Sequence, residues 1–306
     1  MRKFIKNSIY FSLPFLIWAI FVFIIDPFNY FNKIHLVDNN AKVNAENLNT
    51  LLYRTIDFFN YPSNNILIGD SRTDALPKDL IETYSKKKFK KLNTNATKIN
   101  EIFDLFYLVN ETHKLDQVVI GINFSMFNKY SYQNRIQSLE RIIKNPLLYI
   151  YNIDTIEASF FVIRSLILNK NLNSKPSVDK ESFWEWTINV KGEHWYGKYD
   201  FPKKIYNELF KFDNFTHDNK IDVVFIIIPH HVDFNEKLFL YGLEKEKENF
   251  KNIMSNLHAK VFDFDFKNSI TTDKNNFVDP IHYNDSIGKV IVKEIWNNQL
   301  LIGKKL

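Results

Sequence analysis

The feature that most constrains the fold is a short apolar run that leads into Gly69-Asp70-Ser71. Residues 64–68 read Asn-Asn-Ile-Leu-Ile, and a helix-like segment begins beyond Pro77. This pattern predicts a buried strand, a tight turn and a helix. A serine in such a turn projects its hydroxyl above the carboxyl edge of a parallel sheet, where the helix start offers backbone N–H groups. The alternative is a polar loop in which Ser71 or Thr73 caps the helix.

A second chemistry-bearing segment lies near the end of the chain. Residues 275–284 form a turn-rich loop that contains Asp279-Pro280-Ile281-His282, and an apolar-periodic helix follows over 287–300. A serine nucleophile needs a base within hydrogen-bonding reach and a third group that orients the base. We therefore expect Ser71 to be the nucleophile, His282 the base and Asp279 the orienting carboxylate. The alternative for His282 is a solvated loop histidine or a cap of the last helix.

Strand-like and helix-like segments alternate between these two ends. Such alternation predicts right-handed βαβ crossovers and an α/β fold with a parallel sheet, whose ligand site lies at the carboxyl ends of the strands. The expected strands are 89–93, 117–123, 222–229 and 260–264, and the expected helices are 45–59, 100–114, 202–212 and 235–256.

Residues 128–200 break this rhythm with a Tyr-rich helical stretch, a polar loop and two aromatic clusters, 183–186 and 194–197. We interpret the segment as a helical, aromatic insertion or cap beside the site. Exposed aromatic rings there could stack on sugar rings, and the alternative is that they pack the insertion onto the core.

Three ordered blocks resemble those of the SGNH, or GDSL-type, hydrolase superfamily: Gly69-Asp70-Ser71, Gly121-Ile122-Asn123 and Asp279-Pro280-Ile281-His282. The resemblance implies an SGNH-like three-layer fold with a central parallel sheet over residues 61–300. It also implies that the Asn123 side chain donates to an oxyanion beside the Ser71 backbone N–H. The alternative for Asn123 is a strand-end amide that satisfies a turn.

The chain departs from the family pattern in two places. The second block usually supplies a glycine N–H to the oxyanion hole, but residues 93–98 contain no glycine. A backbone N–H of Thr97 or Lys98 could replace it, and alignment from Asn93 favours Lys98. In the third block Phe124 follows Asn123 in place of the usual aspartate, which removes a polar neighbour.

Three further polar residues have uses that the sequence leaves open. Arg72 directly follows the proposed nucleophile, where it could bind an anionic substrate group or pair with Asp70 or Asp74. His230 and His231 follow a strand end, but adjacent side chains on an extended strand face opposite ways and we identify no third ligand. We therefore expect a substrate-pocket or structural role for His230, with no metal and no cofactor.

The N-terminus predicts a membrane anchor. Residues 1–6 are basic, and residues 8–25 carry no charge and would form about 27 Å of helix, close to the thickness of a bilayer core. No small residues precede a cleavage site, so we expect an uncleaved single span. The basic flank (residues 1–7) should stay in the cytoplasm. Residues 26–60 would then be a juxtamembrane connection outside the cytoplasmic (inner) membrane, which is the periplasm in a Gram-negative cell.

Composition excludes several classes of protein. The 306-residue chain has 45% hydrophobic and 25% charged residues, an ordinary globular mixture that argues against broad disorder. The net charge of +5 comes largely from the N-terminal flank, and no basic stripe suggests nucleic acid. The absence of cysteine excludes disulfides, thiolate chemistry and Cys-based zinc sites.

An N-terminal anchor followed by an SGNH-like domain resembles bacterial proteins that modify envelope polymers, among them the alginate O-acetylation and teichoic acid D-alanylation proteins. The resemblance implies a serine esterase or O-acyltransferase that modifies a cell-surface polysaccharide, or another acylated envelope polymer, through an acyl-Ser71 intermediate. It also implies a multi-span membrane O-acyltransferase as partner. The competing hypothesis is an inactive SGNH-like scaffold that binds glycan or organises an envelope acylation machine.

Overall fold

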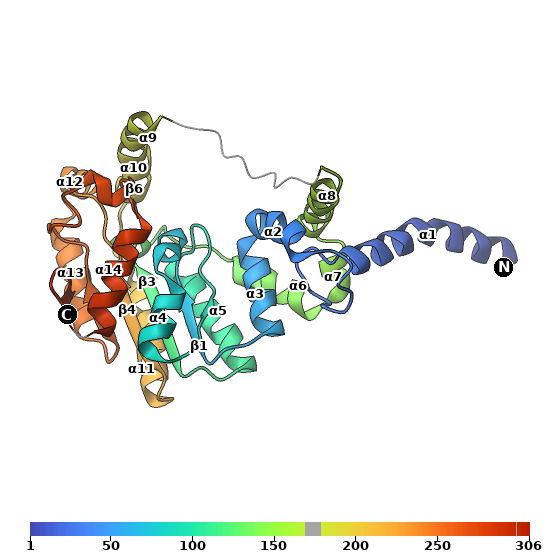
Figure 1. The fold of residues 1–306 in the computed structure, drawn as a ribbon, viewed down its shortest axis with the longest axis horizontal. Helices are drawn as coiled ribbons and strands as arrows, with labels where there is room; N and C mark the ends of the chain where they lie inside the picture. The colour runs from blue at the N-terminus through green and yellow to red at the C-terminus, as the bar shows by residue number, and fades with distance from the viewer. Residues whose placement is uncertain (169–178, 298) are drawn as a thin grey trace. The chain divides into compact units, whose positions relative to one another are not determined.

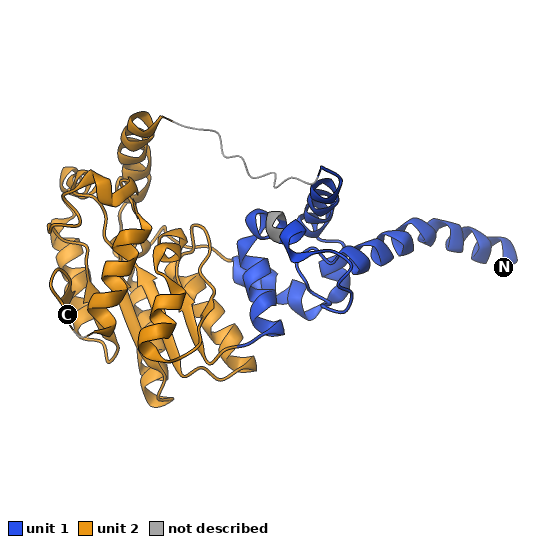
Figure 2. Ribbon diagram, viewed as in Figure 1, with its two compact units in different colours: residues 1–62, 135–175 blue, residues 63–134, 176–306 orange. Residues whose placement is uncertain are grey.

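The computed structural model describes residues 1–168, 179–297 and 299–306. The chain forms two compact units: unit 1 is residues 1–62 and 135–175, and unit 2 is residues 63–134 and 176–306 (Figure 2). The segment predicted as an insertion, residues 128–200, therefore contributes helices to both units. The candidate site lies within unit 2.

Unit 2 contains a mixed, mostly parallel sheet in the order β2-β1-β3-β4-β5-β8, in which only β8 runs antiparallel, along β5 (Figure 1). The order of its first five strands is a common order of doubly wound α/β folds, whose ligand site lies at the carboxyl ends of the strands at the switch point, here β1 and β3. The predicted α/β fold class is confirmed. The strands are β1 (Asn65–Ile68), β2 (Lys90–Lys91), β3 (Gln117–Ile122), β4 (Asp222–Ile227), β5 (Lys260–Asp263) and β8 (Lys304–Lys305).

Helices cover both faces of this sheet, because side chains alternate between its faces along each strand. They are α4 (Lys78–Ser85), α5 (Ile99–Thr112), α9 (Lys180–Trp186), α10 (Gly192–Tyr196), α11 (Lys203–Asp218), α12 (Val232–Leu240), α13 (Glu244–Ser255) and α14 (Asp285–Trp296). Leu67 and Val119 pack in one cluster with Ile81 of α4 and Ile291 of α14. On the opposite face, Phe225 contacts α11, which packs against α5.

One long helix predicted in this unit is divided. The pattern over 235–256 suggested a single helix, but the structure has α12 and α13 with a break between them. Gly242 lies in the break with φ 64°, a left-handed conformation that glycine adopts without the steric cost of a Cβ. The apolar periodicity continues through the break, which explains why the pattern alone did not show it.

Unit 1 is helical. Its elements are α1 (Arg2–Ile25), α2 (Asn39–Leu48), α3 (Thr50–Asn60), α6 (Arg135–Lys144), α7 (Pro146–Ile150) and α8 (Ile153–Leu168). Helix α1 is long and apolar enough to cross a membrane. The helix predicted over 45–59 is two helices, because Asn49 ends α2 and its side chain caps α3 by accepting from the Leu52 N–H at 2.9 Å.

Asp26 fixes the chain as it leaves α1. The residue ends the helix in the left-handed conformation (φ 42°) and its side chain is buried. Its carboxylate accepts backbone N–H groups of Tyr30 at 2.7 Å, Phe31 at 3.0 Å and Asn32 at 2.9 Å. The acidic residue that closes the apolar run therefore also organises the connection that follows it.

Candidate active site

Ser71 lies at the tight turn that follows β1. A 3₁₀ turn, Ser71–Ala75, begins there, and the Asp70 side chain caps it by accepting the Arg72 N–H at 3.0 Å. The helix past Pro77, α4, begins after Pro77 without a side-chain cap, so neither Ser71 nor Thr73 caps it, contrary to the alternative. Gly69 is required because a Cβ on it would lie 2.1 Å from Thr73 Oγ1. The turn thus leaves the Ser71 hydroxyl available for other partners.

Asp279 and His282 are presented by a short antiparallel hairpin, β6 (Phe277–Asp279) and β7 (His282–Tyr283). Helix α14 follows the hairpin and packs against the turn that carries Ser71. A Cβ on Gly288 of α14 would lie 1.9 Å from the Ala75 carbonyl oxygen, so glycine permits this close contact. The contact holds the nucleophile turn against the element that carries the histidine.

The structure brings the three predicted triad side chains together. Ser71 Oγ lies 2.9 Å from His282 Nε2, and His282 Nδ1 lies 2.8 Å from Asp279 Oδ2. The other Asp279 oxygen accepts the backbone N–H groups of Ile281 at 2.9 Å and His282 at 3.0 Å. Ser71 and His282 are 211 residues apart in the sequence, and the fold of unit 2 brings them together.

The hydrogen bonds determine which imidazole nitrogen carries the proton. Burial opposes ionisation of Asp279, but the hydrogen bond and charge of His282, together with the Ile281 N–H, hold the pKa of this carboxyl below its usual value. An ionised carboxylate only accepts hydrogen bonds, so Nδ1 of His282 carries the proton that faces Asp279. Nε2 is left with a lone pair directed at the Ser71 hydroxyl, as a general base requires.

Two hydrogen-bond donors beside the nucleophile are unpaired. Asn123 is fully buried, and its Nδ2 has no partner in the described part of the chain. The Ser71 backbone N–H, the first of its turn, also lacks an acceptor among the described residues. Strand β1 pairs Ile68 with Ile120 of β3, so the segments that carry Ser71 and Asn123 both follow the ends of neighbouring parallel strands. A buried amide and a free turn N–H at this edge of the sheet suit an oxyanion.

The predicted donor in the second block is wrong. The Lys98 N–H is directed to the Glu101 carboxylate at 3.2 Å as part of a capping box at the start of α5. The Thr97 hydroxyl donates to the Thr94 carbonyl at 2.8 Å. The residue of this loop that adopts the left-handed conformation is Ala96 (φ 55°), and this is the conformation that glycine adopts most easily.

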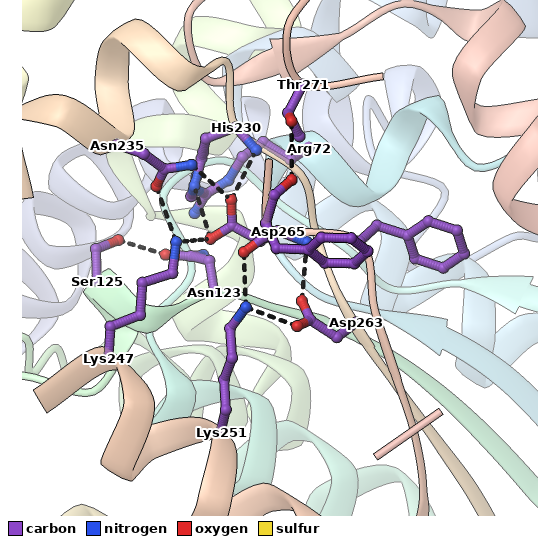
Figure 3. A network of polar contacts seen from close by, with 12 residues as sticks. Arg72, Asn123, Ser125, His230, Asn235, Lys247, Lys251, Asp263, Asp265 and Thr271 are labelled. Carbon is purple, nitrogen blue, oxygen red and sulfur yellow. Dashed lines mark hydrogen bonds and ion pairs between the residues drawn. The ribbon is translucent and has the colours of Figure 1, made fainter. Parts of the chain in front are cut away.

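The structure places Arg72 and His230 in the interior of unit 2, which fits the structural alternative that the sequence left open for each of them. Both are buried. Arg72 forms an ion pair with Asp70, with Nε at 2.9 Å from Oδ2, and its Nη1 lies 2.7 Å from His230 Nε2 (Figure 3). The pairing with Asp70 is thus the one of the three uses proposed for Arg72 that the structure shows. No exposed surface of either side chain remains for a substrate.

His230 connects Arg72 to a second buried carboxylate, Asp265 (Figure 3). Arginine can only donate, so His230 Nε2 accepts and Nδ1 carries the proton, 3.5 Å from Asp265 Oδ2. Burial lowers the pKa of His230 despite the opposing charge of Asp265, which keeps the imidazole neutral. Lys247 lies 2.7 Å from the same carboxylate. Against the effect of burial, Lys247 and His230 hold the pKa of Asp265 well below its usual value.

His231 serves a different purpose from its neighbour. Its Nδ1 accepts the Asp233 N–H at 3.2 Å and caps α12, and its ring meets Trp184 edge-on. The two histidines therefore point to separate partners, as adjacent strand-end side chains should. Within the described residues, no group of three or more His, Cys, Asp or Glu side chains could hold a metal ion.

The aromatic clusters of residues 183–197 are divided between packing and exposure. Trp184 is buried and donates to Asp233 at 3.0 Å, and Trp195 stacks on the Arg72 guanidinium at 5.1 Å. Trp186 is exposed, but its ring stacks on that of Phe183 with centroids 5.7 Å apart, and Lys191 Nζ lies 5.8 Å from its centroid. Lys191 lies on the π-helical turn Thr187–Lys191; burial lowers its pKa, and the charge of Asp279 opposes this.

Sequence reasoning missed Asp265, Lys247 and Lys191. A lone lysine or aspartate in a charged helix or loop carries no spacing signal, and the Glu/Lys-rich pattern of α13 is typical of a solvated face. A parallel strand that ends in Asp263-Phe264-Asp265 was a usable signal, because such ends meet at the site edge of the sheet.

No family model and no curated protein matches the chain. The solved structures that are similar to it include the following two. One, from Desulfitobacterium hafniense DCB-2 and provisionally described as a lipolytic protein of the G-D-S-L family, has a TM-score of 0.36 at 11% identity and covers 77% of this chain and 98% of its own. The other, from Streptococcus pneumoniae and provisionally described as a platelet activating factor, has a TM-score of 0.40 at 12% identity. It covers 86% of this chain and 95% of its own.

Replacing Asn123 with alanine should lower kcat by ~10²–10³-fold and leave KM nearly unchanged, since the donor would act only on the transition state. Steady-state kinetics and the melting temperature should be measured together. Ser125→Ala is the matched control, because Ser125 donates to Asn123 Oδ1 without being a donor to the oxyanion. If Asn123→Ala turns over normally and only melts earlier, Asn123 is a structural amide.

Proposed function

We propose that the chain is a membrane-anchored, extracytoplasmic serine esterase or O-acyltransferase that modifies a cell-envelope polysaccharide through an acyl-Ser71 intermediate. The observation that carries the proposal is the continuous hydrogen-bonded series from Ser71 Oγ through His282 to Asp279. Ionised Asp279 and the Nδ1–H tautomer of His282 are the states in which this series can remove a proton from serine.

Each step of the proposed reaction uses a group in this series. His282 Nε2 takes the Ser71 proton as Oγ forms a bond to the ester carbonyl carbon. The Ser71 N–H and Asn123 Nδ2 donate to the oxyanion that develops. When the intermediate collapses, the ester C–O bond breaks and His282 returns the proton to the leaving alcohol. Water or a sugar hydroxyl, deprotonated by His282, then attacks the acyl-Ser71 carbonyl carbon. The bond from this carbon to Ser71 Oγ breaks, and His282 returns the proton to Oγ.

The envelope setting is supported by α1 and by the resemblance of the ordered blocks. Helix α1 is long and apolar enough to span a bilayer, and the basic residues before it favour a cytoplasmic N-terminus. Unit 2 would then act on a polymer outside the membrane, with the acyl group delivered by a multi-span O-acyltransferase.

A fluorophosphonate probe tests the enzymatic part of the proposal. The full chain in detergent micelles should become covalently labelled, and Ser71→Ala should abolish the labelling. Ser269→Ala, at an exposed serine of the same unit, is the control and should label like the wild type. An unlabelled wild-type chain that is folded by circular dichroism would favour the inactive scaffold.

A further inference from the structure

Helix α8 buries mostly small side chains and exposes several large apolar ones. The side chains that it buries within unit 1 include Ala158, Ser159 and Ser165. Val162 is buried, and Ile156 and Ile163 are half-buried. The other large apolar side chains point outward, with Phe160 59% exposed and Ile167 76% exposed. A helix of a water-soluble domain shows the reverse pattern, with large apolar residues inside. Small residues at a helix interface are instead typical of helices that pack within a membrane.

The short helix α7 and the start of α8 continue this apolar surface. Leu147 is 63% exposed and Ile153 is 62% exposed. The exposed side chains of Glu157 and Arg164 lie on the same face of α8. Exposed apolar surface of this kind marks a contact with a partner or with lipid.

Helix α1 itself indicates what covers the surface, because α7 and α8 pack directly against it. Trp18 Nε1 donates to the Ile150 carbonyl at 3.0 Å, and the Tyr151 hydroxyl donates to the Phe15 carbonyl at 3.0 Å. The Trp18 ring also contacts the Phe160 ring, with centroids 5.9 Å apart. The exposed apolar surface is thus continuous with the helix proposed to cross the bilayer.

The positions of these contacts along α1 set their depth. The apolar run ends at Asp26, which marks the outer boundary. Trp18 and Phe15 precede Ile25 by seven and ten residues, which corresponds to about 10 Å and about 15 Å along a helix. Amphipathic helices in a membrane interface bury their apolar face about 5–10 Å. Side chains that contact α1 at Trp18 therefore lie at the depth of lipid acyl chains.

We propose that α7 and α8 are a second membrane-embedded element of this chain, whose outward apolar side chains contact lipid acyl chains of the outer leaflet beside α1. The inference rests on the anchoring part of the proposed function and is independent of the catalytic part. On this proposal α1, α7 and α8 of unit 1 all contact lipid, whereas the sequence suggested one membrane helix followed by a connection in water. Both segments are helical, so their backbone groups are satisfied without water.

The absence of natural cysteine permits a direct test on the full chain. Leu147→Cys, Phe160→Cys and Ile167→Cys, each alone, should be labelled with a nitroxide and reconstituted into phosphatidylethanolamine/phosphatidylglycerol vesicles. Collision rates with oxygen, which concentrates in lipid, and with a water-soluble nickel chelate give the depth of each label. Ile17→Cys in α1 is the lipid reference, and Leu240→Cys, 74% exposed on unit 2, is the water reference.

The three test labels should match Ile17→Cys, with oxygen collisions several-fold above those at Leu240→Cys and little nickel quenching. Nickel access at Phe160→Cys and Ile167→Cys, with Ile17→Cys protected, would overturn the second element and leave the anchor intact. Nickel access at Ile17→Cys would instead overturn the anchor. Labels shielded from both reagents would show that protein, such as a second copy, covers the surface, and this also contradicts the proposal. A circular dichroism spectrum like that of the wild type identifies variants that remain folded.

Discussion

Ser71→Ala, His282→Ala and the double variant should each lose about the same activity, on the order of 10⁴–10⁶ in kcat on p-nitrophenyl acetate. The equality follows from the 2.9 Å contact between Ser71 Oγ and His282 Nε2, which makes the two groups one proton-transfer unit. Once the nucleophile is absent, a base has no proton to take, and once the base is absent the hydroxyl is a poor nucleophile. The residual rate comes from the oxyanion donors and from substrate binding.

The measurement is kcat and KM for the full chain and the three variants, with Ser269→Ala as the control for an exposed serine. Losses that multiply in the double variant would contradict the proposal, because multiplicative effects indicate groups that act independently. A loss that appears only in Ser71→Ala would remove His282 from the mechanism and leave Ser71 as a nucleophile with another base.

The triad could be predicted because its residues carry signals that survive in a single sequence. Ser71 follows an apolar run and a glycine, and Asp279 and His282 share one loop ahead of a periodic helix. Parallel-sheet topology then requires that residues after strand ends meet at one edge, whatever their separation in sequence. The position of Asn123 at this edge could be predicted for the same reason, since Asn123 directly follows β3.

The second block and the network behind the nucleophile could not be predicted in this way. Whether the Lys98 N–H is available depends on the position of the Glu101 side chain, which spacing does not specify. The partner of Arg72 depends on which of two nearby carboxylates the turn geometry brings to it. The sequence around His230 fits a substrate pocket, a metal site or a buried hydrogen bond. The structure favours the last, because His230 and its partners Arg72 and Asp265 are all buried.

Removing one partner of the buried Asp70–Arg72 pair should strongly destabilise unit 2. Arg72→Met leaves the Asp70 carboxylate buried without a cation, which typically costs about 3–5 kcal/mol of unfolding free energy. Both side chains are almost fully buried, with exposures of 7% for Asp70 and 4% for Arg72, so water cannot replace the lost partner. The midpoint of denaturant unfolding, followed by tryptophan fluorescence, measures the effect. Lys260→Met, which breaks an exposed pair with Asp222 in the same unit, should leave the midpoint nearly unchanged.

The double variant Asp70→Asn/Arg72→Met separates a buried charge from a general packing defect. Asparagine keeps the side-chain acceptor that caps the 3₁₀ turn, and the variant contains neither charge. It should therefore recover most of the stability that Arg72→Met loses, since a pair removed as a whole leaves no isolated ion. Stability as low as that of the single variant would show that the packing of the arginine, and not its charge, is what unit 2 requires.

The pH dependence of Arg72→Met should have the opposite sign to that of the wild type. In the wild type burial opposes ionisation, but Arg72 holds the pKa of Asp70 below its usual value. The folded state therefore binds fewer protons than the unfolded state, and the contribution of Asp70 to stability is lost as the pH falls below about 4. In Arg72→Met the guanidinium is gone, and burial, opposed by the backbone N–H of residue 72 and by His282, should raise the pKa of Asp70 above its unfolded value. The loss of unfolding free energy in the variant, relative to the wild type, should then become smaller as the pH is lowered from 7 toward about 4. A loss that stays constant over this window would rule out an isolated buried carboxylate as its cause.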